Sequence, residues 1–142
     1  MSQLLRTTRF GEISVDDADV LDFPAGLIGL GGRRYALVAH GTDSPFSWLQ
    51  SADDPALALP VTSPWSFFPD FEVRVAEDDR VRIGSDDIPA AGVYVTVRVD
   101  EDGGFAANLA APIVIAGGRA HQVLNQVTSE FRAPLFATAA AA

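Results

Sequence analysis

Carboxylates dominate the residues that could take part in chemistry, because 19 of the 142 residues are Asp or Glu. The Asp100-Glu101-Asp102 cluster could begin a calcium loop, but its twelfth position is Ala111, where such a loop needs glutamate. General acid–base catalysis needs two acids that face each other in a pocket, and clusters along the chain do not by themselves make such a pair. We interpret the acids as solvated turns that give the surface a negative field. The other acidic clusters are Asp16-Asp17-Asp19-Asp22, Asp53-Asp54, Asp70-Glu72, Glu77-Asp78-Asp79 and Asp86-Asp87.

Several kinds of active site are excluded by missing residue types. The chain has no Cys, and all ten of its basic residues are Arg. Thiolate metal sites, cysteine nucleophiles, P-loops and Schiff-base lysines are therefore absent. His40 and His121 are far apart without metal-ligand spacing, and Ser85 after Gly84 does not lie in a Gly-x-Ser-x-Gly motif. We expect no enzymatic activity, no cofactor and no metal ion.

A glycine-rich segment, Gly26–Arg34, resembles a phosphate-binding loop in composition. The dinucleotide fingerprint requires a strand before the loop and a helix after it. Here Pro24 precedes the loop and a strand-like segment, 35–39, follows it. The pattern favours a simple turn-forming loop. A small anion- or nucleotide-binding barrel module that uses Gly26–Arg34 remains the alternative.

Four aromatic residues lie close together in the segment Pro64–Phe71. One interpretation is that these side chains plug one end of a barrel. The other is that part of the cluster is exposed as a docking site, since aromatic side chains are enriched in binding hot spots. Asp70 and Glu72 would then place negative charge beside an apolar anchor.

The elements that position these residues are predicted to be strands. Residues 93–99 alternate valine with Tyr, Thr and Arg, which is typical of a half-buried strand. Turn residues recur about every ten positions, which predicts a small, mainly antiparallel all-β sandwich or barrel. Residues Ala76–Gly84 are ambiguous, because Val81 and Ile83 alternate like a strand while three acids could begin a helix. The strands are predicted at 11–15, 35–39, 46–50, 58–61, 71–75, 92–99, 106–110, 113–115 and 119–124.

The length fits one domain, which we place at residues 1–136, with 137–142 as a frayed alanine-rich tail. The formal net charge is −9, and the sequence pI is about 4.4. Such a surface repels phosphate, so we expect neither direct nucleic-acid binding nor anionic-membrane binding. No apolar run approaches the roughly 18 residues of a membrane span, and the first residues lack a signal-peptide core. We expect a cytoplasmic protein.

Short blocks of distinctive sequence occur along nearly the whole chain: Arg9-Phe-Gly-Glu12, Phe23-Pro-Ala-Gly-Leu-Ile-Gly29, Pro45-Phe-Ser-Trp-Leu-Gln-Ser51, Asp54-Pro55, Phe67-Phe-Pro-Asp70, Asn108-Leu-Ala-Ala-Pro-Ile-Val-Ile115, Gln122-Val-Leu124 and Phe131-Arg-Ala-Pro-Leu135. In these blocks and in their order, the sequence resembles the FliW family of flagellar assembly factors. Departures are modest: Leu30 stands where an aromatic residue is common, Ala116 where Asn is expected, and Phe131 where Tyr is expected.

The resemblance implies a β-barrel-like single domain with one or two short helices, of which Ala76–Gly84 is one. It also implies a non-enzymatic protein that binds the RNA-binding translational regulator CsrA and relieves its repression of flagellin synthesis. The resemblance further implies that flagellin binds the same protein and competes with CsrA for it. Within matching blocks, we expect Trp48 in the core and Asn108 bonded to neighbouring backbone. Charge and aromatic content, rather than the family pattern, indicate six partner-binding residues: Asp53, Asp54, Phe67, Phe68, Asp70 and Glu72.

Overall fold

The computed structural model describes residues 1–24, 26–27, 33–39, 44–84, 92–99, 103–116 and 118–135. Three short helices lie between the strands: η1 (Asp17–Asp19), η2 (Pro64–Ser66) and α1 (Glu77–Ile83). The strands are β1 (Ser2–Thr7), β2 (Gly11–Asp16), β3 (Val20–Asp22), β4 (Arg34–Ala39), β5 (Phe46–Ser51), β6 (Ala58–Thr62), β7 (Val93–Val99), β8 (Phe105–Ala107), β9 (Ile113–Ala116), β10 (Arg119–Gln122) and β11 (Ala133–Pro134).

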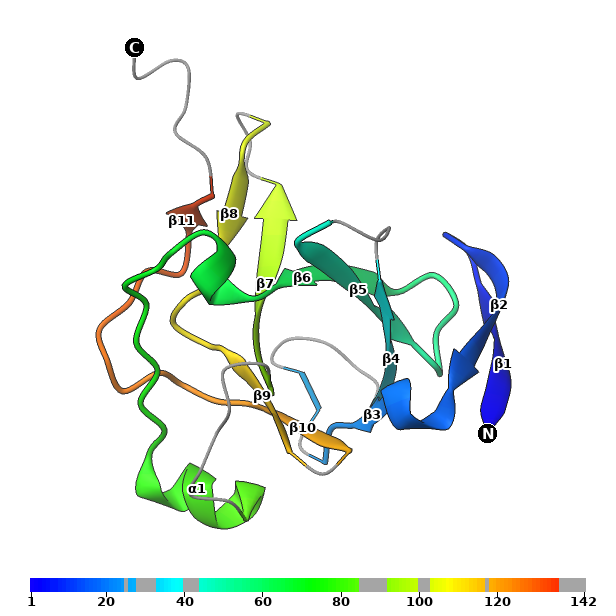
Figure 1. The fold of residues 1–142 in the computed structure, drawn as a ribbon, viewed down its shortest axis with the longest axis horizontal. Coiled ribbons are helices and arrows are strands. Elements are labelled where there is room, and N and C mark those ends of the chain that lie inside the picture. The colour runs from blue at the N-terminus through cyan, green and yellow to red at the C-terminus, as the bar shows by residue number, and fades with distance from the viewer. Residues whose placement is uncertain are drawn as a thin grey trace.

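Seven of these strands close into a barrel in the order β7-β6-β5-β4-β3-β10-β9 (Figure 1). The ring closes because β9 pairs with β7, through Tyr94 opposite Ile113 and Val93 opposite Val114. All neighbouring pairs are antiparallel except β3 and β10, which run parallel and meet at Asp22 and Arg119. The predicted all-β, mainly antiparallel barrel is therefore confirmed.

The inside of the barrel is filled by side chains from the inward face of each strand. Successive residues of a strand point to opposite faces, so one alternate set lines the interior. Tyr35 and Phe23 are fully buried there, with ring centroids 5.4 Å apart in an edge-to-face arrangement. The buried members of this interior cluster are Leu21, Phe23, Leu27, Tyr35, Leu49, Val61, Ile113 and Ala120.

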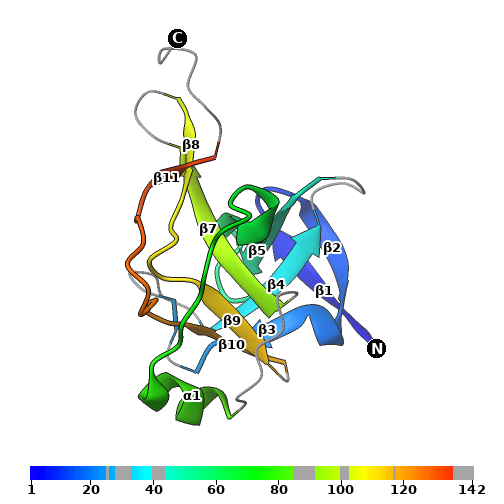
Figure 2. The same cartoon turned by 60° about the vertical axis from the view of Figure 1, so that its left-hand side comes forward.

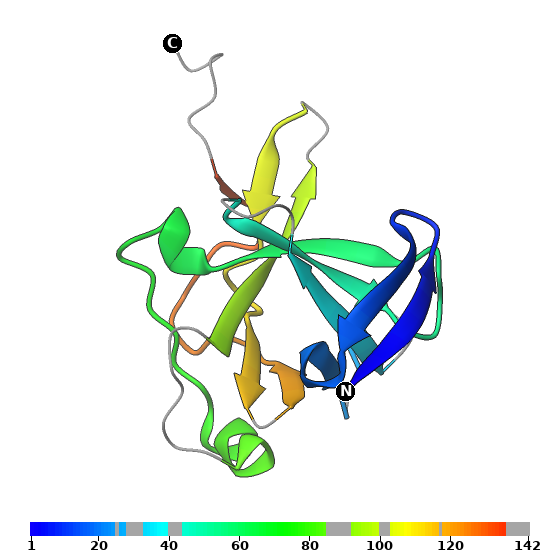
Figure 3. The same cartoon turned by 45° about the vertical axis from the view of Figure 1, so that its right-hand side comes forward.

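Three further clusters cover the outer face of the barrel. The β1–β2 hairpin packs Leu5 and Val15 on Ala36 of β4. On another side, residues before and within α1 pack on Val114 of β9 and on Val123, which follows β10 (Figure 2). The segment 64–71 covers β7 and β8 on a third side, away from the hairpin (Figure 3). These outer layers let both faces of the barrel strands be buried.

The structure corrects the predictions of local structure at three places. Residues 77–83 form helix α1, as the resemblance implied, and not the strand suggested by the alternation. Residues 71–75 form no strand, because the backbone of Arg74 bonds to the segment after β10 without forming a ladder. The Arg74 N–H donates to the Asn125 side-chain Oδ1, and the Arg74 carbonyl accepts from the Gln126 N–H. The predicted strand 106–110 is shorter and shifted, at Phe105–Ala107. The sequence pattern also does not predict the strands β1, β3 and β11.

Some predictions concern residues outside the described part of the chain. These include His40, the Asp86-Asp87 and Asp100–Asp102 clusters, and the tail after residue 135. The domain boundary at residue 136 therefore stays a prediction. Within the described residues, no helix is long and apolar enough to cross a membrane.

Candidate functional site

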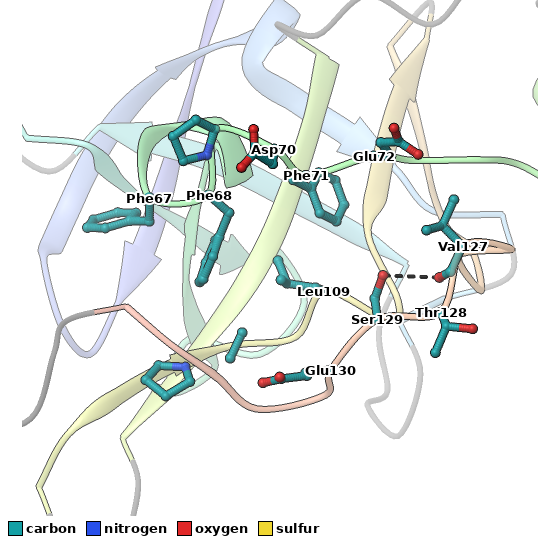
Figure 4. Close-up of a pocket in the computed structure, with 13 residues that line it drawn as sticks. Phe67, Phe68, Asp70, Phe71, Glu72, Leu109, Val127, Thr128, Ser129 and Glu130 are labelled. Atoms are coloured by element: carbon teal, nitrogen blue, oxygen red, sulfur yellow. Dashed lines mark hydrogen bonds between the residues drawn. The ribbon is translucent and has the colours of Figure 1, made fainter. Parts of the chain in front are cut away.

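A groove lies on the outer face of the barrel between the segments 67–72 and 127–134 (Figure 4). It encloses a cavity of about 570 Å³. Such a size falls in the range of about 300–1,000 Å³ that is usual for ligand sites. Its lining residues are Phe67, Phe68, Pro69, Asp70, Phe71, Glu72, Leu109, Val127, Thr128, Ser129, Glu130, Ala133 and Pro134.

The aromatic wall of the groove is part of the hydrophobic packing as well as of the surface. Phe67, Phe68 and Phe71 are half-buried and pack against a buried cluster that includes Val95 and Leu109. Val95 belongs to the outward face of β7, so the aromatic cluster covers the outside of the barrel and does not plug its end. All three residues line the groove.

Side-chain and ring contacts fix the backbone of this aromatic segment. The Trp65 indole Nε1 donates a hydrogen bond of 2.9 Å to the Phe71 carbonyl, and the two rings lie 5.5 Å apart. Phe67 packs on Phe46 of β5 with ring centroids 5.5 Å apart. The first wall of the groove is therefore held in place by aromatic contacts with the strands beneath it.

Asn125 joins the two walls of the groove. Its Oδ1 accepts hydrogen bonds from the backbone N–H of Arg74, at 3.0 Å, and of Val127, at 3.2 Å. Its Nδ2 donates to the carbonyl of Glu72, at 2.9 Å, and lies 3.4 Å from that of Leu109. One side chain thus connects the segment after Phe71, the chain after β8, and the second wall.

Three exposed carboxylates surround the apolar wall: Asp70 and Glu72 on one segment, and Glu130 on the other. Glu130 is held in position by its carbonyl, which accepts a hydrogen bond of 2.9 Å from the Leu109 N–H. Among the described residues, the ion pairs are Arg6–Glu12 and Arg82–Asp79, and neither involves the groove. The groove therefore combines aromatic surface with uncompensated negative charge.

Asp53 and Asp54 lie elsewhere, in the turn between β5 and β6. The Ser51 Oγ accepts hydrogen bonds from both of their backbone N–H groups, at 3.1 and 2.9 Å. The carbonyl of the next residue, Pro55, accepts a hydrogen bond of 2.8 Å from the N–H of Thr8 in the turn of the β1–β2 hairpin. This turn therefore belongs to the side of the barrel that carries the β1–β2 hairpin.

The strand that leads into this turn has one polar residue on each face. Gln50 is fully buried on the outward face of β5, opposite Ala36, and its Nε2 lies 3.1 Å from the Ser51 carbonyl and 3.3 Å from that of Pro55. Ser51 lies on the inward face, opposite Tyr35 of the interior cluster. Burial raises the pKa of Tyr35, and the nearby carboxylates Asp53 and Asp54 raise it further. Neither of these two acids lines the groove.

Of the six partner-binding residues predicted from the sequence, the structure brings four together. Phe67, Phe68, Asp70 and Glu72 share the groove, whereas Asp53 and Asp54 lie on another side. The structure adds Glu130 as a third acid and Asn125 as the residue that joins the walls. Sequence reasoning missed both, because their position depends on contacts with residues 16 to 53 positions away in the chain.

Two residues of the matching blocks occupy informative places. Trp48 is half-buried and not in the core, with the Arg9 guanidinium carbon 4.3 Å from the ring centroid and Phe10 in edge contact at 5.9 Å. It therefore holds the hairpin turn against β5. The Asn108 Oδ1 accepts a hydrogen bond of 3.1 Å from the Ala110 N–H, so the backbone-bonding role predicted for Asn108 is confirmed.

The glycine-rich segment is described only in part. Its two arginines donate hydrogen bonds within the protein: Arg33 to the Pro24 carbonyl, and Arg34 to the Gln3 Oε1 at 3.4 Å. Residues 28–32 lie outside the described part of the chain. In the described ranges, no group of three or more His, Asp or Glu side chains is placed to hold a metal ion.

A closed seven-strand barrel with an acidic, aromatic groove on its outer face defines this chain as a small β-barrel protein. Comparison with protein families is more specific. The family model described as "FliW protein" matches residues 4–135, and the chain therefore belongs to the FliW family.

Known proteins similar to this chain agree with that assignment. Flagellar assembly factor FliW 2 of Desulfotalea psychrophila is 37% identical over 120 residues, which cover 82% of this chain and 80% of the relative. Flagellar assembly factor FliW of Bdellovibrio bacteriovorus is 33% identical over 138 residues, which cover 94% and 79%. A crystal structure of the flagellar assembly factor FliW superimposes with a TM-score of 0.81 at 28% identity, covering 95% of this chain and 98% of that one.

Proposed function

We propose that this protein is a non-enzymatic flagellar assembly factor that works in the cytoplasm by binding other proteins. Its first partner is a CsrA-type RNA-binding regulator, whose repression of flagellin mRNA it relieves. Its second partner is flagellin, which competes for it and so returns the regulator to the mRNA. The names of the relatives support the assembly role, and the resemblance of the sequence blocks supports the two partners.

The groove is the observation that carries this proposal. Its half-buried phenylalanines offer apolar anchoring surface, and Asp70, Glu72 and Glu130 surround that surface with negative charge. An RNA-binding protein needs a basic surface for phosphate, and a basic surface is complementary to this groove. Occupation of the basic surface by an acidic protein would oppose RNA binding by charge repulsion as well as by competition.

Affinity measurements on two pairs of charge-reversal variants test where the regulator binds. We expect Asp70→Lys combined with Glu72→Lys to weaken binding to purified CsrA by roughly tenfold or more, since reversed charges at a contact are strongly unfavourable. Asp53→Lys combined with Asp54→Lys changes the net charge equally but lies outside the groove, so it is the matched control. An equal or larger loss in the control pair, measured by calorimetry at low salt, would contradict groove binding.

A competition experiment tests the partner exchange itself. Purified protein added to a complex of CsrA and flagellin mRNA should release the RNA, and added flagellin should restore the complex. Gel-shift assays with labelled RNA report both steps. Failure of a saturating amount of this protein to release RNA would remove the proposed role in translation, whichever surface the regulator uses.

A further inference from the structure

A second cavity, of about 510 Å³, opens at one end of the barrel interior. Leu27 and Leu59 form part of its wall and pack in or against the interior cluster. Thr96 and Gln122 also line it, and their cross-strand partners, Val61 and Ile113, belong to the interior cluster. Directly opposed residues of paired strands face the same side, so these polar side chains point to the inside of the barrel. This cavity is separate from the groove, with which it shares no residue.

Hydrogen-bond donors converge on this end of the barrel. The Asn108 Oδ1 is occupied by the Ala110 N–H, which fixes the amide and leaves its Nδ2 as a donor. Within the described ranges, neither this Nδ2 nor the Thr96 hydroxyl has an assigned hydrogen bond. Arg98 lines the same cavity and lies two positions beyond Thr96 on β7, so it shares the inward face of that strand.

The described lining of this cavity differs in residue type from the acidic groove. The formal net charge of the chain is −9, yet the described lining of this cavity contains one arginine and no carboxylate. Guanidinium and amide N–H groups are strong donors to a carboxylate, which accepts two or more hydrogen bonds at once. Leu27 and Leu59, which line the same cavity, would contact a short apolar group attached to the carboxylate. A single cation matches a single negative charge better than it matches a dianion.

We propose that the barrel end binds a small carboxylate with an aliphatic or aromatic body. The carboxylate is held by Arg98, the Asn108 amide and the Thr96 hydroxyl, and the apolar body lies against Leu27 and Leu59. The cavity volume is within the range of sites for small molecules. This site is independent of the proposed binding of CsrA and flagellin, because it uses other residues on another part of the barrel.

A titration followed by amide chemical shifts tests the proposal with hexanoate as the probe. We expect saturable shifts at Leu59, Thr96 and Asn108 up to about 10 mM, where a site of millimolar affinity is nearly full. The groove residues Phe68 and Glu130 should not shift. Hexylammonium, which has the same apolar body and the opposite charge, should give no saturable shift. No saturable shift with hexanoate, or equal binding of both compounds, would overturn the proposal.

Three variants separate recognition of the carboxylate from mere apolar contact. Asn108→Asp keeps the oxygen that accepts from Ala110 but replaces the donor with negative charge, and Thr96→Val keeps the shape of the side chain without its hydroxyl. With Arg98→Gln, each should weaken hexanoate binding by roughly tenfold, as expected for a lost hydrogen bond to a charged group. Glu72→Gln in the groove is the matched control. Unchanged affinity in all three variants, with the spectrum of the folded protein retained, would contradict the site.

Discussion

Asn125 is the side chain on which the shape of the groove depends most directly. It accepts two backbone hydrogen bonds and donates to the Glu72 carbonyl at 2.9 Å. Asn125→Ala removes all of them and leaves part-buried backbone groups unpaired, so we expect unfolding free energy to fall by about 2–3 kcal/mol. Asn125→Asp keeps the accepting oxygen and should cost less. Denaturant unfolding of both variants checks the order, and equal losses would contradict it.

Phe68 has both a packing role and a surface role. Because it is half-buried against the cluster that contains Leu109, Phe68→Ala should lower the unfolding free energy by about 2 kcal/mol, less than the roughly 3–5 kcal/mol of a fully buried phenylalanine. The same variant should weaken CsrA binding. Chemical denaturation and calorimetry on one sample measure both effects. A stability loss without any loss of affinity would assign Phe68 to packing alone.

The sequence predicts the part of the site that is local in the chain and misses the part that is not. Phe67, Phe68, Asp70 and Glu72 are within six residues, so proline-framed aromatics followed by acids could be recognised as one unit. Glu130 reaches them only through the pairing of its backbone with Leu109. Charge alone groups Asp53 and Asp54 with Asp70 and Glu72 as predicted contacts, and charge carries no information about which side of a barrel a turn occupies.

Helix α1 illustrates how an element can contradict its own periodicity. Val81 and Ile83 alternate with arginines as in a strand, yet only Ile83 packs on the barrel and Val81 stays exposed. The acids Glu77, Asp78 and Asp79 lie in the first turn, where they interact favourably with the helix dipole. A helix of seven residues is too short for hydrophobic periodicity to identify it. The residues at its two ends, the acidic first turn and Gly84, are therefore more informative than the pattern of apolar residues inside it.

The two ends of α1 offer opposite tests of its stability. Ala76 occupies the N-cap position with extended backbone and no side-chain cap, so Ala76→Ser should raise the unfolding free energy by about 0.5–1 kcal/mol. Gly84 ends the helix with a left-handed backbone, at a φ of 76°, and no atom lies within 4 Å of a methyl group added there. Gly84→Ala should nevertheless lower the unfolding free energy by about 1 kcal/mol, because alanine disfavours this backbone conformation. Thermal unfolding compares the pair, and shifts of the same sign would contradict this account.

His121 on β10 makes stability depend on pH. Its pKa is lowered, first by burial and then by Arg82 and Arg119, and the carboxylates of Asp79 and Asp22 oppose this only in part. Its Nε2 is buried without a hydrogen-bond acceptor among the described residues. The unfolded chain therefore binds the proton more readily than the folded one. The resulting stability is present above the unfolded pKa of about 6.5 and is lost as the pH falls below it.

Unfolding measurements between pH 7.5 and 5.5 test the role of His121. The free energy of unfolding should decrease as the pH falls through this range, and His121→Gln should flatten that decrease. His40→Gln removes the other histidine of the chain and is the matched control. If the pH dependence disappears with His40→Gln and persists with His121→Gln, the assignment is wrong.

Closure of the barrel is a property of the whole molecule that the resemblance implies but that the strand pattern alone does not distinguish from a sandwich. Alternating strands with short turns indicate antiparallel neighbours, but closure needs two contacts between distant segments. One is the parallel meeting of β3 with β10, at Asp22 and Arg119, and the other is the pairing of β7 with β9. Both depend on the geometry of the complete ring, which also decides that the aromatic segment covers an outer face.

The separation of acids onto two sides of the barrel leads to a kinetic prediction for the whole molecule. A net charge of −9 attracts a basic partner from every direction, whereas only the groove acids would contact it after docking. Association with CsrA should therefore slow by roughly tenfold as salt is raised from low to high concentration, because screening shortens the reach of the field.

The two pairs of charge-reversal variants separate attraction at a distance from contact after docking. Asp53→Lys with Asp54→Lys should slow association and leave dissociation unchanged. Asp70→Lys with Glu72→Lys should slow association and should also speed dissociation. Stopped-flow measurement of both rate constants separates the two effects. An association rate that does not change with salt would mean that the net charge of the protein plays no part in recognition. Faster dissociation in the Asp53 and Asp54 variant would place the contact at the side of the barrel that carries the β1–β2 hairpin.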